Sequence, residues 1–336
     1  MTTVAQQADL FIEGLSNRRR KAKPATIKSY GSYLRNWIVP VLGAYELGAI
    51  GNREAKVFVT HLVDQHLAAA TVSGALTTLK LLVASELNEN GDRLWHPDWN
   101  TDFIDAPPVD PKEQNAPVIA ARELNAALRK ASSHYALYYA LQAGSGLRMG
   151  EMLALRRGLD DGIRSFLDLE KSIVFVRSTI YNRVEQSTKS ESGTREVDLC
   201  STLVKWLKEH PDVNRTETGS YLFQTGKQTL WHVANMYDRF KADGIPGSHS
   251  LRRFRTTHLE NLSVPRVLVD YWTGHVGKAI TDRYTKLGQS INARNNWCRR
   301  AGLGFQLPGE PEENVIYEEP LDMDEDTLEK EIEEGL

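Results

Sequence analysis

Six residues in three short stretches carry side chains suited to phosphate chemistry. They are Arg148, Glu151, His249, Arg252, His275 and Tyr284. A glycine-rich turn delivers the first arginine at the start of a predicted helix, and the glutamate three residues later lies on the same helical face. The first histidine and the second arginine open another predicted helix. The second histidine follows a glycine, and the tyrosine stands nine residues after it.

Together, these residue types predict phosphoryl transfer through a covalent phosphotyrosine. Two arginines can hold the non-bridging oxygens of one phosphate with bidentate donors and stabilise its crowded transition state. Histidines can move protons near neutral pH. A tyrosine becomes a nucleophile once its proton, with an ordinary pKa of about 10, is removed or its anion is stabilised.

Each of these residues also has a plainer interpretation. Arg148 could cap a helix or pair with Glu151, and a lone histidine is more often a core or surface residue. Tyr284 taken alone would be a packing residue. Tyr271 is a competing nucleophile, but it lies beside Trp272 in an apolar run, where core packing is expected. The joint occurrence of all six favours the chemical interpretation.

At these positions the chain resembles the tyrosine recombinases, the lambda-integrase family. The matching motifs are GLRMGEML at 146–153, HSLR at 249–252 and Gly-His at 274–275, with Tyr284 nine residues on. The amino-terminal segment is similar to the helical core-binding domain of that family, through TIKSY at 26–30 and ATVSGALTTL at 70–79. The resemblance covers about residues 8–303.

The resemblance implies a role for each of these residues. Arg148 and Arg252 would bind the scissile phosphate. His249 and His275 would hydrogen-bond it, with His249 as the acid or base. Tyr284 would attack the phosphorus, leaving a 3′-phosphotyrosyl bond and a free 5′-hydroxyl.

Two further positions follow from the same resemblance. Glu151 would orient Arg148 or its neighbour. Lys189, in the polar turn TKSESGTR at 188–195, matches the lysine that acts as acid for the 5′-oxygen, and Lys171 competes with it but precedes the predicted strand. Because the bond energy is kept in the covalent intermediate, the resemblance implies no metal and no nucleotide cofactor.

The elements that must position these residues predict a mainly α fold with one small antiparallel β-sheet. Apolar residues at helical spacing predict helices after Pro24 and at 53–66, 69–87, 120–132, 135–142, 149–156, 202–209, 229–241, 251–262, 264–273 and 291–300. Runs rich in β-branched residues predict strands at 172–179, 181–185 and 194–199, with a turn around 190–193.

The predicted domain boundaries follow a proline-rich, polar segment, DAPPVDPKEQNAP at 105–117. We expect a helical, SAM-like core-binding domain at 1–106, a linker at 107–117, an α+β catalytic domain at 118–304 and an acidic tail at 305–336. The tail holds 13 acidic residues and one lysine, so it carries −12 of a net charge of −3 and leaves +9 on the body. A basic body predicts a polyanionic partner. The tail could solubilise the chain, restrain activity by docking on a basic surface, or bind another protein.

Candidate DNA contacts lie in the first predicted domain. They are Arg18, Arg19, Arg20, Lys21, Lys28, Thr71, Ser73, Thr77 and Lys80. The basic cluster could equally be solvated charge beside a terminus, and the second group could be a solvated helix face. Trp95 and Trp99 are expected to pack rather than to stack on bases.

The composition leads to further expectations about location and metal binding. No run of about 18 apolar residues appears, so no transmembrane span is expected. The start of the chain lacks the pattern of a signal peptide, so we expect a cytoplasmic protein that joins the nucleoid when bound to DNA. Cys200 and Cys298 form no CxxC pair, so we expect neither structural zinc nor a disulfide.

These observations predict a site-specific recombinase that integrates or excises a phage genome or other mobile element. The resemblance implies two domains clamped around duplex DNA and four protomers on two specific sites, with possible DNA-bending accessory proteins. One rival is an enzyme similar to the type IB topoisomerases, which the separate core-binding domain disfavours. The other is a catalytically silent DNA-binding regulator, which the intact residue set disfavours.

Overall fold

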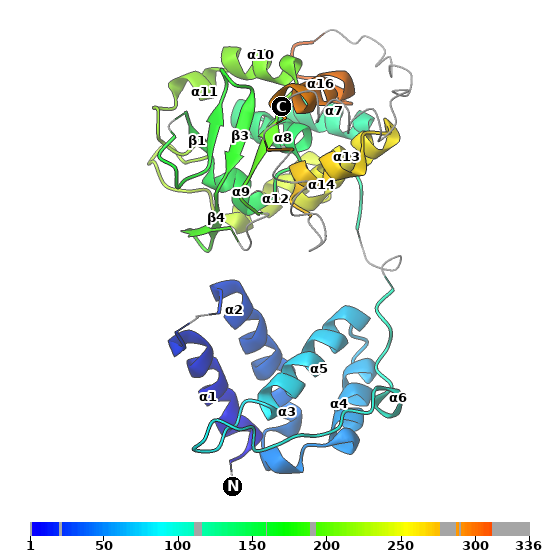
Figure 1. The fold of residues 1–336 in the computed structure, drawn as a ribbon. Coiled ribbons are helices and arrows are strands. Elements are labelled where there is room, and N and C mark those ends of the chain that lie inside the picture. The colour runs from blue at the N-terminus through cyan, green and yellow to red at the C-terminus, as the bar shows by residue number, and fades with distance from the viewer. Residues whose placement is uncertain are drawn as a thin grey trace. The chain divides into compact units, whose positions relative to one another are not determined.

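The chain forms two compact units, each with its own buried apolar core (Figure 1). The units are Met1–Asn115 and Ala116–Leu336. The structure, a computed structural model, describes residues 2–19, 22–110, 116–158, 160–188, 193–275, 287–288 and 290–310.

The described part of the first unit is built from helices. They are α1 (Val4–Asn17), α2 (Pro24–Tyr33), a π-helical segment (Leu34–Ile38), α3 (Val39–Leu42), a 3₁₀ turn (Leu47–Ala49), α4 (Asn52–Asp64), α5 (Ala69–Val83) and α6 (Thr101–Ile104). The analysis of the sequence missed α1, although Thr3 and Gln6 form a capping box at its start. The α5 prediction was four residues too long, because the chain turns after Val83 and Leu87 bridges to Arg93 instead.

Helix α5 supplies much of the first core because its apolar residues recur every three or four positions. It buries Val72, Ala75, Leu76, Leu79, Leu82 and Val83. Both tryptophans pack against this core, as predicted. The indole nitrogen of Trp95 donates to Glu86 at 2.6 Å, and the Lys80 ammonium lies 5.4 Å from the centroid of the Trp99 ring.

The second unit combines nine described helices with six described strands. The helices are α7 (Ala121–Lys130), α8 (Ser133–Ser145), α9 (Met149–Ala154), α10 (Ser201–Glu209), α11 (Pro211–Arg215), α12 (Val233–Asp243), α13 (Ser248–Asn261), α14 (Arg266–Thr273) and α16 (Ile291–Ala301). The strands are β1 (Arg156–Arg157), β2 (Phe166–Asp168), β3 (Ile173–Val176), β4 (Ser178–Tyr181), β5 (Val184–Ser187) and β6 (Arg195–Asp198). The mainly helical fold with small sheets is as predicted.

The strands form two sheets rather than the single antiparallel sheet predicted. One sheet has the order β1-β2-β3-β6, with β1 and β2 parallel and the other pairs antiparallel; β4 and β5 form a separate antiparallel hairpin. The predicted strand 172–179 breaks at Arg177. There the hydroxyl of buried Ser165 accepts the backbone N–H groups of Arg177 and Ser178, at 2.9 and 2.8 Å, so the chain leaves the ladder without unpaired donors.

Two helix boundaries differ from prediction because turns or proline intervene. Helix α12 begins at Val233 rather than at residue 229, because Thr225 and Thr229 close a turn through their backbones. Helix α14 begins only after Pro265, which stands at its N-cap. Helices α14 and α16 both pack on β6, and α13 packs on α8.

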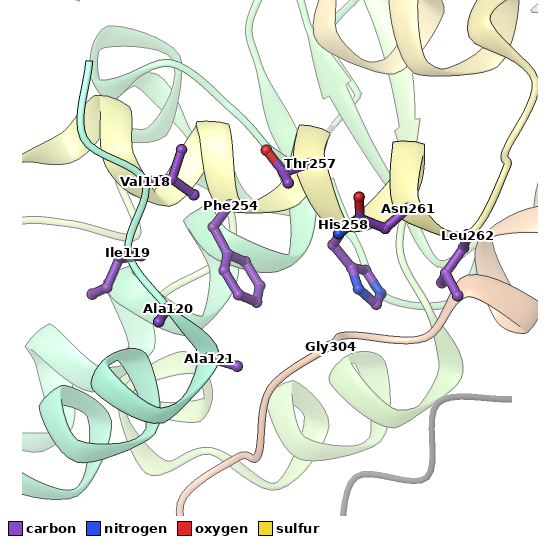
Figure 2. Close-up of a pocket in the computed structure, with 10 residues that line it drawn as sticks. All are labelled: Val118, Ile119, Ala120, Ala121, Phe254, Thr257, His258, Asn261, Leu262 and Gly304. Carbon is purple, nitrogen blue, oxygen red and sulfur yellow. The ribbon is translucent and has the colours of Figure 1, made fainter. Parts of the chain in front are cut away.

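A shallow groove of about 440 Å³ lies along α13, between the start of α7 and the segment at Gly304 (Figure 2). Phe254 and His258 project into it, and their rings are nearly parallel, with centroids 6.2 Å apart. A Cβ at Gly304, whose φ is +74°, would lie 2.4 Å from the His258 ring, so only glycine fits there. The His258 Nε2–H donates to the carbonyl of Ala301 at 2.8 Å, which ties α13 to the end of α16.

His258 should make the second unit sensitive to acid. Burial, and then the Arg255 charge, lower the pKa of this histidine to about 4. The unfolded chain, with a histidine pKa of about 6.5, therefore binds the proton first. The stability that the folded state gains by keeping His258 neutral is complete above pH 6.5 and is lost as the pH falls toward 4.

From pH 7 to pH 5 we expect the free energy of unfolding to fall by about 2 kcal/mol through this group. Urea unfolding at the two pH values measures it. The control is His258→Gln, which keeps an N–H donor without the titration and should lose less over the same interval. Equal losses in the two proteins would show that His258 is not the group responsible.

Candidate active site

Arg148 stands at the junction of α8 and α9, where the chain must reverse. Helix α8 ends at Gly146, whose φ of +69° places it in the left-handed region. Arg148 is the N-cap of α9, and Glu151 in its first turn accepts the Arg148 backbone N–H at 2.8 Å and the guanidinium NH1 at 3.0 Å. The Arg148 guanidinium NH2 also donates to the Gly274 carbonyl at 3.4 Å. Its side chain remains 37% exposed, so a ligand can reach it.

Arg195 on β6 is a buried partner that the analysis of the sequence did not single out. Its side chain is fully buried, and NH1 and NH2 donate to the two Glu151 oxygens at 3.2 and 3.0 Å. Its Nε donates to the carbonyl of Trp272 at 2.8 Å. One signal was present: Arg195 shares a strand face with Val197, and an arginine on an apolar face needs a buried partner.

The electrostatics of Glu151 are set by these two arginines. Burial alone would raise its pKa, but the charge and hydrogen bonds of Arg195, followed by those of Arg148, lower it to about 2. Glu151 is therefore ionised at neutral pH and holds both guanidinium groups in fixed positions.

Arg252, on the first turns of α13, is the second arginine of the site. It is 5% exposed, and its NH1 and NH2 donate to the carbonyls of Gly146 and Thr273, each at 2.6 Å. Burial, and then the charge of Arg148, lower its pKa to about 9. The Arg148 contribution shows that the two positive charges repel, and an anion placed beside both arginines would relieve that repulsion.

His275 contacts Arg252 directly, with Nε2 at 3.0 Å from the guanidinium NH2. A guanidinium can only donate, so the Nε2 of the imidazole accepts and its proton lies on Nδ1, 3.3 Å from the Thr273 hydroxyl. Burial and the charges of Arg252 and Arg148 lower the pKa of His275. The histidine is therefore neutral at pH 7 in this arrangement.

His249 lies in the first turn of α13 and stays exposed. Its pKa is lowered by burial and by the nearby charges of Arg252, Arg253 and Arg148. The structure thus forms two contacting pairs, Arg148 with Glu151 and Arg252 with His275. The two arginines bond to the adjacent carbonyls of Gly274 and Thr273, and the charges of both arginines act on His249. Lys189 and Tyr284, the implied acid and nucleophile, lie outside the described residues.

The residues that competed for the acid and nucleophile roles, Lys171 and Tyr271, have other contacts. Lys171 pairs with Asp168 at 3.8 Å on the surface. Tyr271 is 4% exposed, and burial raises its pKa to about 12. Its core packing was predicted.

The candidate DNA contacts of the first unit form two groups. Arg18, Arg19 and Lys28 are exposed, and Arg20 and Lys21 lie outside the described residues. On α5, Thr77 is exposed, Thr71, Ser73 and Lys80 are half-buried, and Lys80 already lies against Trp99. Arg18, Arg19, Lys28 and Thr77 are therefore the candidates most open to a ligand.

Neither a metal centre nor a membrane-spanning helix appears in the described part of the chain. Among those residues no three histidine, cysteine or acidic side chains come together as metal ligands. None of the helices described there is long and apolar enough to span a bilayer. Cys200 and Cys298 are both buried free thiols.

Paired arginines, an ionised glutamate that fixes one of them, and neutral histidines define a site for phosphoryl transfer. Residues 119–290 match the phage integrase family. The chain belongs to this family of tyrosine recombinases, enzymes that cleave and rejoin DNA strands.

Relatives and solved structures agree with this family. A XerC-like tyrosine recombinase of Caldanaerobacter subterraneus subsp. tengcongensis is 24% identical over 290 residues, which are 78% of this chain and 74% of the relative. The Tn1549 transposon integrase, solved with a circular intermediate DNA, is 17% identical with a TM-score of 0.64 over 84% of this chain and 95% of that one. A lambda integrase dimer on a core site is 15% identical with a TM-score of 0.57 over 84% and 95%. The two structures share the fold.

Proposed function

We propose that this protein is a site-specific recombinase that integrates or excises a mobile element, cutting DNA through a 3′-phosphotyrosyl bond to Tyr284. The observation that carries the proposal is that Arg148 and Arg252 donate to adjacent carbonyls, those of Gly274 and Thr273, while Glu151 holds Arg148. A DNA phosphate has the charge and the paired oxygens that such donors bind.

In the proposed reaction Arg148 and Arg252 hold the non-bridging oxygens of the scissile phosphate. The Tyr284 oxygen forms a bond to phosphorus as the bond to the 5′-oxygen breaks. His249 moves the proton of the tyrosine, and Lys189 supplies a proton to the leaving 5′-oxygen. Rejoining reverses these steps with a new 5′-hydroxyl, so the phosphodiester energy is conserved and no nucleotide is consumed.

His275 has a narrower part in this scheme. As the Nδ1–H tautomer, it accepts from Arg252 at Nε2. Nε2 can donate to a phosphate oxygen only after it gains a proton; otherwise the ring must rotate so that Nδ1–H donates. We therefore assign His275 to binding the phosphate and His249 to acid–base transfer.

The proposed assembly follows from the family. Residues 1–106 act as the core-binding domain, 118–304 as the catalytic domain and 305–336 as an acidic tail. Four copies would act on two duplex sites; a lambda integrase of similar fold has been solved as a tetramer bound to a Holliday junction. We further propose a cytoplasmic protein that works on the nucleoid, with DNA-bending proteins as possible accessories and a phage or transposon genome as the cargo.

A nicked suicide substrate tests the chemistry. The substrate is DNA flanking the gene, nicked just beyond the cleavage point. On cleavage, the short fragment that carries the free 5′-hydroxyl diffuses away, so the covalent adduct cannot be rejoined and accumulates. Wild-type protein should form a slowly migrating DNA–protein band, and Tyr284→Phe should form none. Tyr271→Phe is the matched control and should retain the adduct.

The other outcomes point to different proteins. Binding without an adduct on every DNA tested would support a silent DNA-binding regulator. An adduct on any single duplex, with relaxation of supercoils and no need for a second site, would support a topoisomerase-like enzyme. An adduct in Tyr284→Phe would move the nucleophile to another tyrosine, with Tyr271 the first to test.

The exposed basic residues should set part of the salt dependence of DNA binding. Changing Arg18, Arg19 and Lys28 together to glutamine should flatten the slope of log affinity against log salt by about 2 to 3, because each phosphate contact releases about 0.9 counterions. Fluorescence anisotropy between low and moderate salt measures the slope. Lys56→Gln is the control, since that ammonium lies 4.7 Å from the Phe103 ring centroid. An unchanged slope in the triple variant would assign these charges to solvent.

A further inference from the structure

Gln142, near the end of α8, joins the two arginine motifs through one buried amide. It is fully buried, and its Nε2 donates to the carbonyl of Leu147 at 3.0 Å and to the hydroxyl of Ser248 at 2.6 Å. Leu147 directly precedes Arg148, and Ser248 directly precedes His249. The two N–H groups of a single amide therefore reach the residue before Arg148 and the residue before His249.

The orientation of this amide is fixed by its partners. A backbone carbonyl can only accept, so the nitrogen and not the oxygen must face Leu147. Both N–H hydrogens are then used, and the buried Oε1 finds no hydrogen-bond partner in the described structure. An apolar side chain of the same length would avoid that unpaired oxygen. The burial of Gln142 is thus explained by the two bonds it donates rather than by packing.

The main chain of Gln142 holds the same turn from the other side. Its carbonyl accepts the Gly146 N–H at 2.8 Å, so one residue closes the turn through both backbone and side chain. A second link crosses between the motifs where Arg252 donates to the Gly146 carbonyl. These two links add to the packing of α13 on α8 and tie the start of α13 to the turn.

We propose that Gln142 is a positioning residue that holds Arg148 and the His249–Arg252 turn in the mutual placement needed to bind one phosphate. The proposal rests on the proposed function, since it assumes that both motifs meet the scissile phosphate. Gln142 does not touch the DNA. It affects the relative position of Arg148 and Arg252, which lie on different helices.

Gln142→Met tests the proposal because methionine keeps the length and burial of the side chain but donates no hydrogen bond. On the nicked substrate, under single-turnover conditions, we expect the adduct to form about 10 to 100 times more slowly, because small misplacements of reacting groups cost up to about 100-fold. DNA affinity should stay close to that of the wild type. The melting temperature should change little, because removal of the unpaired Oε1 offsets the lost donors to the Leu147 carbonyl and the Ser248 hydroxyl.

Ser248→Ala is the second variant and loses only one of the two bonds. It should slow cleavage less than Gln142→Met, and adding it to Gln142→Met should have little further effect, since the shared bond is already gone. Tyr139→Phe is the matched control. It removes another buried hydrogen bond of α8, from the Tyr139 hydroxyl to Asp243 at 2.8 Å, and should lower stability without slowing cleavage.

These experiments test the positioning role of Gln142 separately from the proposed recombinase function. If wild-type protein forms no adduct on any DNA, the proposed function fails and the inference fails with it. If wild type forms the adduct and Gln142→Met matches its rate, the function stands and the positioning role is overturned. Additive rate losses in Gln142→Met and Ser248→Ala, or a loss explained wholly by unfolding or weaker DNA binding, would also overturn it.

Discussion

Lysine in place of Arg252 is expected to slow covalent cleavage about 1000-fold with little loss of DNA affinity. The guanidinium is held by carbonyl acceptors on two sides, Gly146 and Thr273, so its plane has a fixed orientation. An ammonium is a point charge that cannot reproduce this planar fork. Removing one preorganised donor from a transition state costs about 100- to 1000-fold, and displacing an arginine can cost more. Adduct formation on the nicked substrate measures the rate.

Arg253→Lys is the matched control for that prediction. Arg253 is the next residue of α13, is half-buried, and donates to the Pro117 carbonyl at 2.9 Å. The same substitution there should leave cleavage near the wild-type rate. If Arg252→Lys cleaves as fast as this control, the phosphate is bound elsewhere.

Methionine in place of Arg294 should destabilise the second unit by about 3 to 5 kcal/mol. The Arg294 side chain is fully buried on α16, and its Nε pairs with an equally buried Asp198 on β6 at 2.9 Å. Its NH1 also donates to the carbonyls of Leu287 and Gly288, at 2.6 and 2.9 Å. Without the guanidinium, Asp198 would keep its bond from the Trp272 indole but would become an uncompensated buried charge. Urea unfolding of the second unit measures the loss.

Two further variants show whether the buried charge is the cause. Adding Asp198→Asn to Arg294→Met should recover part of the stability, because the orphaned charge is removed while an acceptor for Trp272 remains. Arg299→Met, on the exposed side of the same helix, should change stability by less than about 0.5 kcal/mol. Equal losses at positions 294 and 299 would contradict the ion-pair explanation.

Helices with regular apolar spacing were predictable, because burial of one face dominates their energetics. Helix α5 is an example, and its predicted start at Ala69 is exact. The end was not, because the turn after Val83 depends on contacts from Glu86 to Trp95 and Thr2, far apart in sequence. The break at Arg177 had the same origin: Ser165, twelve residues away, supplies the acceptor.

The candidate site was predictable only as far as its motifs are local. Arg148 and Glu151 are three residues apart on one helix, so their contact follows from helical geometry. Arg195 and Gln142 act across the fold, and no spacing in the chain records which buried groups they meet. Asp198 is the buried partner of Arg294 and of the Trp272 indole, and these contacts also join distant parts of the chain.

The site has one carboxylate, Glu151, for three nearby guanidinium groups, those of Arg148, Arg195 and Arg252. It therefore carries a net positive charge before any DNA binds. Binding and folding are coupled by mass action, so an anion that occupies this position also stabilises the folded chain. Copies that have released their DNA would be the least stable members of the population. Cellular proteases act on unfolded chains, and the lifetime of the protein would then depend on how much of it remains on DNA.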